Sequence, residues 1–390
     1  MRRMKGAAGL LTALLLAFQL SAQTFALANE DNGIKVVPVN FTHNGYSYEI
    51  EGVAKSTDGD YQMKSPARLA ARKLPSTYDP RSSGEITTVK DQASTGACWA
   101  FSALACAEQD LIKKGLENPS TEFSVPALVL SSNSGTATGK DDFSSGGNWL
   151  FAASDLANGQ GLCYEDYEPF LESGTGNMIV SENKKSVSEY RLNYVMELSS
   201  TTQVKRKIME LGAVSASYFA GNGYMNHNNT AYYDPDASKN TIINHSVTVV
   251  GWDDNYSKDN FRYKPANNGA WLVKGSWGAD QDNDGFYWVS YDEAEFGQFC
   301  CYDFEESCDN TYHYSKMTGY VVNASNDGSV YGANVFTAKA DEKLDKAGFM
   351  YVGKTGSADY TLSVYTNVSD SDPICLLYTS PSPRDGLLSR

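Results

Sequence analysis

The segment Gln92–Ala103 (QASTGACWAFSA) decides the fold that we expect for this chain. Apolar residues recur at helical spacing after Cys98. The recurring positions are Phe101, Leu104, Ala105, Leu111 and Ile112. Gly115 follows as a C-terminal stop, and Ser94 and Thr95 stand where helix N-caps belong. The spacing therefore predicts a helix that begins beside Cys98.

Cys98 is a candidate nucleophile, because the free N–H groups and the dipole at a helix N-terminus stabilise a thiolate. A buried structural thiol is the other interpretation of this cysteine taken alone. A thiolate nucleophile needs a base, and the chain has four histidines. His43 precedes the patterned region, His313 lies among C-terminal strands, and His227 lies in an Asn-rich loop. His245 begins a predicted strand 147 residues after Cys98, so it is the candidate base.

The remaining pattern indicates an α+β fold class. Two further helices are expected at Trp149–Ala157 and Thr202–Leu211. An antiparallel meander is expected after Asn244. Its strands are His245–Val250, Ala270–Val273 and Gly285–Tyr291. From Ser307 onward the pattern predicts strands alone, as in part of a β-sandwich. These strands are Gly319–Val322, Ala333–Thr337, Lys346–Val352 and Tyr360–Tyr365.

Several motifs, taken in order and spacing, resemble those of the papain-like cysteine peptidases. Gln92–Ala103 resembles the nucleophile segment of that family, with Gln92 six residues before Cys98. Asn244–Trp252 (NHSVTVVGW) resembles the histidine segment, and Trp271–Gly278 (WLVKGSWG) resembles the block that follows it. Ser145–Trp149 (SGGNW) is similar to the family's Gly-Gly element. The resemblance covers roughly residues 74–302.

The resemblance implies a papain-like two-lobed fold, with a helical lobe and an antiparallel β lobe, in residues 74–306. Residues 307–374 resemble the lectin-like domain that follows such peptidases in exported proteins of Gram-positive bacteria. They would form an incomplete, truncated all-β sandwich-like domain. Sugar binding by this domain rests on fold analogy alone.

The resemblance also implies a mechanism of peptide-bond hydrolysis. The Cys98 thiolate attacks the peptide carbonyl, and His245 protonates the leaving amine and later activates water. The Gln92 side-chain amide and the Cys98 backbone N–H stabilise the oxyanion. Substrate contacts are implied for three residues: Gly146, Gly147 and Trp277.

Gly275 is the most important departure from the family pattern, because the family has an asparagine in this place. That asparagine orients the imidazole, and losing one such hydrogen bond costs about 1–3 kcal/mol, or roughly ten- to a hundredfold in rate. An exported cysteine endopeptidase of reduced activity is the main prediction. A weakened or inactive relative that binds peptides or glycans is the alternative. A cell-wall amidase on a smaller fold is disfavoured by Gly146-Gly147 and by the Cys98–His245 separation.

Two other departures concern disulfides and metals. Thr95 replaces a cysteine that forms a disulfide in many relatives, and Ser145 stands near its partner's place. Gln281 replaces a second family tryptophan inside Asp280–Gly285 (DQDNDG). This fragment matches the start of a calcium loop, but Tyr291 rather than Glu is at its twelfth position, which favours an acidic turn. We expect no metal and no cofactor.

The sequence patterns at the two ends of the chain do not indicate parts of the folded domains. Met1–Ala28 has a basic start, a short apolar run and an Ala-Leu-Ala end, and is predicted to be a signal peptide. Asn29–Lys73 is polar and is interpreted as a pro-region or spacer. Cys375–Asp385 (CLLYTSPSPRD) matches the translation of a common sequencing adapter, so residues 375–390 are interpreted as an artefact.

Composition limits the remaining function classes. The chain has 390 residues, 41% of them hydrophobic, and a net charge of −15. Such a chain can bury a core, and its acidity argues against a nucleic-acid partner. Its seven cysteines, one of them in the artefact, form no CxxC pair, which argues against a structural zinc site. We expect a secreted protein without a transmembrane span in the mature chain. The expected partners are a peptide or protein substrate and a cell-surface glycan.

Overall fold

The computed structural model describes most of the chain between residues 73 and 307 and shorter stretches near both ends. The described residues are 10–12, 23–27, 35–43, 46–54, 73–131, 143, 146–157, 162–167, 169–170, 189–221, 223–237, 243–279, 283–307, 310–312, 335–340, 342 and 348–352. The chain divides into two compact units. One is Pro66–Asp309, and the other joins Met1–Ser65 to Asn310–Arg390.

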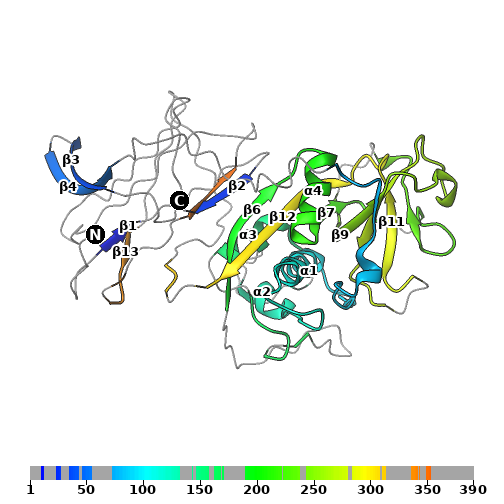
Figure 1. Cartoon of the computed structure of the whole chain (residues 1–390), viewed down its shortest axis with the longest axis horizontal. Coiled ribbons are helices and arrows are strands. Elements are labelled where there is room, and N and C mark those ends of the chain that lie inside the picture. The colour runs from blue at the N-terminus through cyan, green and yellow to red at the C-terminus, as the bar shows by residue number, and fades with distance from the viewer. Residues whose placement is uncertain are drawn as a thin grey trace. The chain divides into compact units, whose positions relative to one another are not determined.

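A mostly antiparallel sheet forms one layer of the unit Pro66–Asp309 (Figure 1). Its strands lie in the order β6-β12-β7-β9-β10-β11-β8, and β5 pairs with β9. Their bounds are β5 Thr77–Tyr78, β6 Tyr190–Glu197, β7 Val214–Tyr218, β8 Ala231–Tyr232, β9 His245–Asp253, β10 Ala270–Lys274, β11 Phe286–Ser290 and β12 Gly297–Glu306. The predicted meander is confirmed, since β9, β10 and β11 pair antiparallel in succession.

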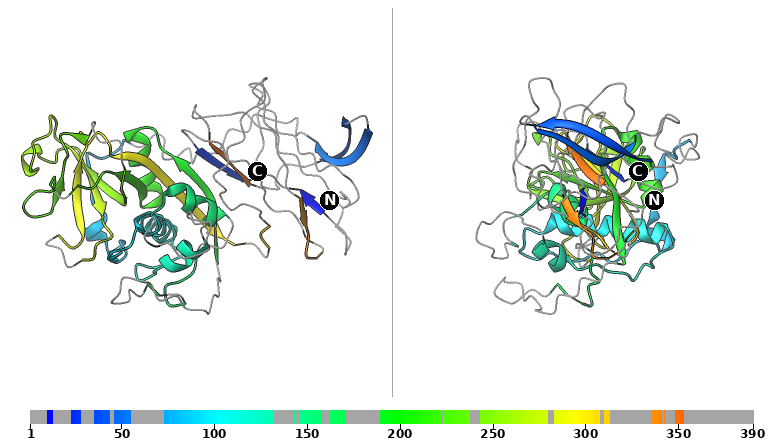
Figure 2. Two further views of the ribbon diagram at one scale, coloured as in Figure 1. Left: turned by 180° about the vertical axis from the view of Figure 1, so that it is seen from behind. Right: turned by 90° about the vertical axis from the view of Figure 1, so that its left-hand side faces the viewer.

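Helix α1 (Cys98–Lys113) is the central element of this unit. It is buried from Cys98 to Leu111, so its apolar residues serve packing on all sides. It lies between α2 (Val125–Ser131) and the strands β7 and β9 (Figure 1 and Figure 2). Helix α3 matches its predicted bounds, Trp149–Ala157. Helices gathered beside an antiparallel sheet confirm the predicted α+β class.

The two ends of α1 differ from each other. Gly115 has a φ of 72° and donates its N–H to the carbonyl of Ile112, which confirms the predicted stop. The predicted capping by Ser94 or Thr95 is wrong. The N-cap is Ala97, which makes no side-chain capping bond, and the Thr95 hydroxyl donates to a backbone carbonyl upstream of the helix. The first N–H groups of α1 therefore have no side-chain cap.

The other helix of the unit, α4 (Thr201–Leu211), covers the sheet with one apolar face. Its N-cap, Ser200, accepts a hydrogen bond from the Gln203 N–H at 3.3 Å. Val204, Ile208 and Leu211 are buried in a core shared with β7, β9 and β10. Two short 3-10 helices, Pro80–Ser83 and Lys258–Asn260, lie in connections. Within the described part of the chain, no helix is long and apolar enough to cross a membrane.

Three antiparallel strand pairs are described in the other unit. They are β1 (Leu10–Thr12) with β13 (Val335–Thr337), β2 (Gln23–Leu27) with β14 (Gly348–Val352), and β3 (Lys35–His43) with β4 (Tyr46–Ala54). Strands β13 and β14 lie inside two of the predicted C-terminal strands. The other two, Gly319–Val322 and Tyr360–Tyr365, lie outside the described residues. The pair β3–β4 was missed, although Asn44-Gly45 between the two strands is typical of a hairpin turn.

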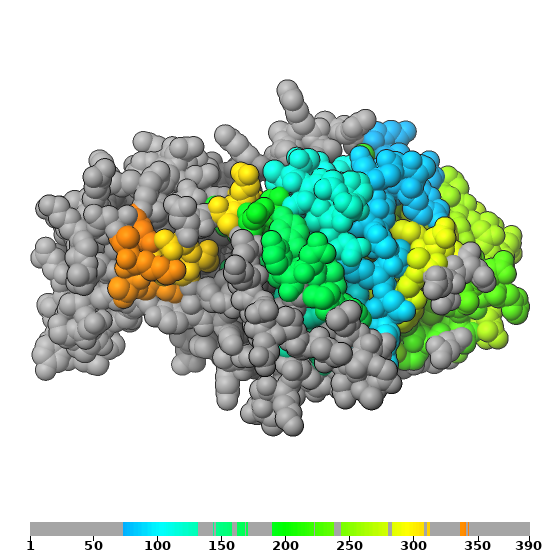
Figure 3. Space-filling view, turned by 90° about the horizontal axis from the view of Figure 1, so that it is seen from below, coloured from blue at the N-terminus to red at the C-terminus, as the bar shows by residue number. Residues whose placement is uncertain are grey.

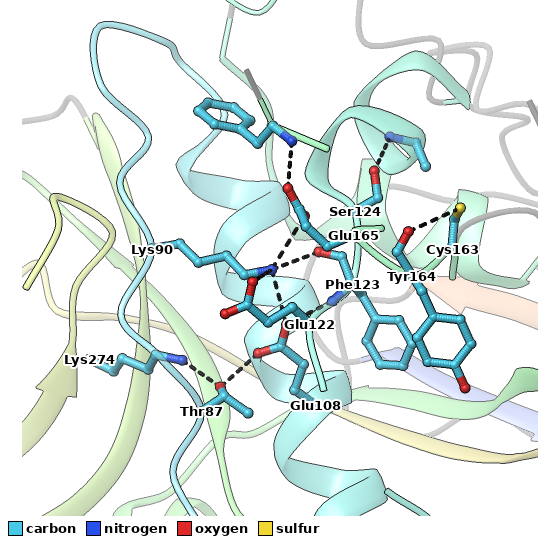
Figure 4. Close-up of polar contacts among 12 residues, drawn as sticks. Thr87, Lys90, Glu108, Glu122, Phe123, Ser124, Cys163, Tyr164, Glu165 and Lys274 are labelled. Carbon is cyan, nitrogen blue, oxygen red and sulfur yellow. Dashed lines mark hydrogen bonds and ion pairs between the residues drawn. The ribbon is translucent and has the colours of Figure 1, made fainter. Parts of the chain in front are cut away.

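A polar cluster of Thr87, Lys90, Glu108 and Lys274, buried except for the partly exposed Lys90, joins α1 to β10 and to the segment before α1 (Figure 4). The carboxylate of Glu108 accepts hydrogen bonds from the Thr87 hydroxyl at 2.7 Å and from the Phe123 N–H at 3.0 Å. Lys90 Nζ lies 3.4 Å from Glu108 Oε1. Lys274 Nζ donates to the Thr87 hydroxyl at 2.7 Å. The segment before α1 is thereby fixed between the helices and the sheet.

We expect Glu108→Gln to lower the free energy of unfolding by about 2 kcal/mol, because it removes the charge of a buried carboxylate that accepts two hydrogen bonds. The substitution also leaves Lys90 with only the more exposed carboxylates of Glu122 and Glu165. Urea unfolding at neutral pH measures the loss. The control is Asp259→Asn, which makes the same chemical change in an exposed ion pair with Lys264 and should have little effect. Losses of equal size in the two variants would contradict the role of the cluster.

Lys274 should make stability depend on pH in the alkaline range. Burial lowers its pKa to about 8 in the folded chain, against 10.5 when exposed. Between these values the unfolded chain holds the proton and the folded chain does not, so stability rises with pH. From pH 7.5 to 9.5 the free energy of unfolding should rise by roughly 2 kcal/mol relative to Lys274→Met. The exposed lysine variant Lys264→Met should show no such difference from the unchanged chain.

Candidate active site

Cys98 is the first residue of α1, and its side chain is buried, with 7% exposed. Burial raises the pKa of its thiol, and hydrogen bonds from the backbone N–H groups of Ser246 and Trp99 act in the opposite direction. The uncapped N-terminus of α1 adds its dipole to these donors. The surroundings of the sulfur thus favour a thiolate through backbone dipoles, against the cost of burial.

His245 is the first residue of β9, and only 5% of it is exposed. Its ring stacks on Trp277 with centroids 4.1 Å apart and planes 6° from parallel. The ring of Tyr218 meets it at 64°, with centroids 5.8 Å apart. Burial lowers the pKa of His245 to about 3. Its Nε2 atom is buried and has no hydrogen-bond partner among the described residues.

The segments that carry the predicted nucleophile and base meet in the core. The N–H of Ser246, the neighbour of His245, acts to lower the pKa of the Cys98 thiol. One turn into α1, the Ser102 hydroxyl donates to the carbonyl of Val247 at 2.7 Å. This hydrogen bond therefore holds the start of α1 beside the start of β9. This contact brings together two segments that are far apart in the sequence.

Gln92 is buried immediately before this contact, and its amide is held at both ends. Its Oε1 accepts from the Ser276 hydroxyl at 2.6 Å, and its Nε2 donates to the Thr95 carbonyl at 2.7 Å. Its backbone N–H also donates to the Ser276 carbonyl at 2.7 Å. An amide nitrogen has two hydrogens. One hydrogen of Gln92 Nε2 is bonded to the Thr95 carbonyl, so the other is left for a further acceptor. In Figure 3 the segment before α1 (blue) lies at the surface between the helices (cyan) and the later strands (yellow).

Gly146 and Gly147 lie directly against the nucleophile turn. Gly146 has a φ of 70°, and a Cβ there would lie 3.9 Å from the Gly96 carbonyl oxygen. A Cβ on Gly147 would overlap the indole ring of Trp99. Only a residue without a side chain allows the backbone to approach Trp99 so closely. The predicted substrate-binding backbone is thus brought next to Cys98.

Gly275 lies two residues before Trp277, whose ring stacks on the imidazole, and it has no side chain. Its N–H donates to the Gly285 carbonyl at 2.9 Å. A Cβ at this position would lie 3.2 Å from that carbonyl oxygen and 3.4 Å from Cε1 of Tyr287. Gly275 supplies no side chain that could bond the unpartnered Nε2 atom of His245.

Four residues at the site were not singled out from the sequence: Tyr218, Ser246, Ser276 and Tyr287. Ser276 and Ser246 stand next to predicted site residues, and adjacency was the signal available for them. The two tyrosines carried no signal, because the chain contains 25 tyrosines and their spacing marks them only as strand residues.

Other positions discussed from the sequence lie outside the described residues. These are Ser145, Gln281 and half of the calcium-like fragment Asp280–Gly285, of which residues 283–285 are described. Among the described residues, no group of three or more His, Cys, Asp or Glu could hold a metal ion. The described cysteines Cys98, Cys106, Cys163, Cys300 and Cys301 are free thiols.

Comparison with known proteins identifies two domain families in the chain. A family model described as papain family cysteine protease matches residues 74–328. A second, described as lectin like domain, matches residues 311–378.

Curated relatives agree with the first match. Falcipain-3 of Plasmodium falciparum is 28% identical over 228 residues, which are 57% of this chain and 42% of the relative. Cathepsin S of Bos taurus is 29% identical over 218 residues, or 55% of this chain and 60% of the relative. The chain thus covers 42% to 60% of the length of these two relatives.

Solved structures agree with both matches. One is of the cysteine protease and lectin-like domains of Cwp84, a surface layer associated protein of Clostridium difficile. It is 31% identical with a TM-score of 0.55, over 61% of this chain and 53% of that chain. A second Cwp84 structure, after propeptide cleavage, is 23% identical with a TM-score of 0.59 over 79% of this chain and 87% of that one, and supports the fold. With a family match over more than half of its length, the chain belongs to the papain family of cysteine proteases.

Proposed function

We propose that the protein is an exported cysteine endopeptidase that uses Cys98 as nucleophile and His245 as general acid and base. The contact between the start of α1 and the start of β9 carries this proposal. It joins the segment that carries the Cys98 thiol to the segment that begins with the buried imidazole of His245, which supports their acting as a pair. Family membership supplies the reaction class, which is hydrolysis of peptide bonds.

The reaction proceeds in two steps. The Cys98 thiolate attacks the carbonyl carbon of the scissile peptide, and the imidazolium of His245 gives its proton to the leaving amine. This step leaves an acyl group on the Cys98 sulfur. His245 then takes a proton from water, which attacks the thioester and releases the acid and the free thiolate. The first step takes a proton from the ring and the second gives one back to it from water, so the thiolate–imidazolium pair is regenerated.

The oxyanion would be held by two donors that the chain keeps in fixed positions. One is the backbone N–H of Cys98 at the start of α1. The other is the Gln92 side-chain amide, whose oxygen end is anchored by Ser276. An amide held at both ends needs little reorganisation when negative charge develops, which is the basis of such stabilisation.

The part of the substrate before the scissile bond would lie along the backbone of Gly146 and Gly147, and the part after it would contact Trp277. Backbone without side chains can pair with an extended peptide, as in other strand-addition complexes. Trp277 covers one face of His245 and is itself 41% exposed, so it offers an apolar surface on the leaving-group side. The substrate is thus a peptide or protein in extended conformation.

The setting would be the exterior of a cell. The predicted signal peptide and the likeness to Cwp84, a surface layer associated protein, support export and location at the cell surface. The lectin-like match over residues 311–378 supports a cell-surface glycan as a further partner. This part of the proposal rests on domain analogy.

The alternative function is a peptide- or glycan-binding protein with weak or absent catalysis. The unpartnered Nε2 of His245, together with the glycine at position 275, is the observation that favours it. Without a hydrogen bond at Nε2, the imidazole is not held in the tautomer that proton transfer requires.

Peptide cleavage decides between the two functions. The exported form, residues 29–374, is incubated with a diverse peptide mixture under reducing, mildly acidic conditions, and mass spectrometry identifies the cuts. We expect cuts that are absent with Cys98→Ala. A folded chain, freed of its pro-region, that makes no Cys98-dependent cuts would exclude the peptidase function.

Gly275→Asn should raise kcat/KM by roughly tenfold, because it gives Nε2 of His245 a hydrogen-bond acceptor, which the aromatic contacts of the ring do not supply. The backbone at Gly285 must shift by a few tenths of an ångström to admit the new Cβ. Gly275→Ala is the matched control, since it meets the same carbonyl without supplying an acceptor. If both variants change kcat/KM alike, orientation of the imidazole is not the limiting factor.

A further inference from the structure

Tyr287 occupies the neighbourhood that the missing asparagine side chain would use. It lies on β11, it is 3% exposed, and its Cε1 atom is 3.4 Å from where a Cβ on Gly275 would be. A large aromatic ring thus stands beside the one position at which the chain departs from the family's histidine-orienting residue.

Tyr287 is bonded to a second tyrosine that touches His245. The hydroxyl oxygens of Tyr287 and Tyr218 lie 2.8 Å apart, and the Tyr218 side chain is 1% exposed. Tyr218 is directly opposite His245 in the register of β7 and β9. Their ring centroids are 5.8 Å apart. A chain of contacts therefore runs from the Tyr287 ring beside Gly275, through the pair of hydroxyls, to the Tyr218 ring and the imidazole.

The Tyr218 ring is itself fixed in place by its neighbours. Tyr232 meets it at 77° with centroids 5.0 Å apart, and Phe296 lies 5.4 Å from it. The other ring in contact with the His245 imidazole is that of Trp277, which stacks on it. Two aromatic surfaces at a large angle to each other restrict rotation of the ring between them, which is what a hydrogen bond to Nε2 would otherwise do.

We propose that Tyr218 and Tyr287 are positioning residues which orient the His245 imidazole in place of the family's asparagine. This inference rests on the proposed function of Cys98 and His245. Tyr218 supplies the ring contact, and Tyr287 fixes Tyr218 through the hydroxyl pair. Burial raises the pKa of both hydroxyls, so they stay protonated throughout the pH range of papain-type catalysis and the bond between them persists.

Alkylation of Cys98 by iodoacetamide tests the orientation without any peptide substrate. The reagent attacks the thiolate, so a rate at acid pH reports the thiolate–imidazolium pair, whereas a rate near pH 10 reports the thiolate alone. The full exported chain is used, and mass spectrometry of the Cys98 peptide separates this thiol from the other cysteines. We expect Tyr287→Phe and Tyr218→Phe each to lower the ratio of the rates at pH 5.5 and pH 10 about tenfold.

Two further variants separate positioning from general packing. Tyr190→Phe removes another buried tyrosine hydroxyl, bonded to Glu117 near the opposite end of α1, and should leave the ratio unchanged. Adding Gly275→Asn to Tyr287→Phe should restore the ratio. An unchanged ratio in both tyrosine variants, or an equal fall in Tyr190→Phe, would overturn the proposal.

The same measurement distinguishes failure of this inference from failure of the proposed function. Alkylation at acid pH in a chain that cuts no peptide would contradict the peptidase function and leave the positioning role standing. Absence of acid-range alkylation from the unchanged chain would contradict the positioning role, because no oriented imidazole would then exist.

Discussion

The contact between the first turn of α1 and the first residues of β9 is the constraint on which the site depends. The Ser102 hydroxyl and the Val247 carbonyl join the two elements at 2.7 Å, inside the core, where such a bond cannot be exchanged for one with water. Because α1 is buried along most of its length, its N-terminus cannot move without disturbing the packing around it. The distance between a helix residue and a strand residue is thereby set by the core.

The same constraint explains why the helix start lacks a side-chain cap. A capping side chain would use the first N–H groups of α1, which here are left near the Cys98 sulfur. The loss of a cap costs about 1 kcal/mol, and the buried packing of α1 offsets it many times over. The same N–H groups could bond a capping side chain, which would stabilise the helix, or act on the Cys98 sulfur, which serves the site. At this helix start they have no capping side chain.

The sequence could predict the parts of the site that are set by local pattern. The helix after Cys98, the strand after His245 and the turn glycine at Gly115 follow from periodicity and residue type, and each was found. The capping by Ser94 or Thr95 was predicted wrongly, because a local preference was overridden by the bonds of Gln92 and Thr95 with each other. Tyr218 and Tyr287 could not be predicted, since their hydroxyls meet only after β7, β9, β10 and β11 have paired in register.

The opposite pKa shifts of Cys98 and His245 have one cause, and this bears on how an ion pair can form between them. Burial disfavours the thiolate and the imidazolium alike, and so raises one pKa and lowers the other. Each shift describes a charge created alone. Transfer of the proton from sulfur to imidazole creates both charges together, in a medium of low dielectric constant where their attraction is strong. The attraction between the two charges therefore offsets part of the cost of burying each of them, provided that the ring faces the sulfur. Orientation of the imidazole thus decides the charge state of the pair as well as the path of the proton, which is why the residue at position 275 and the rings that surround His245 matter more than the burial of either group.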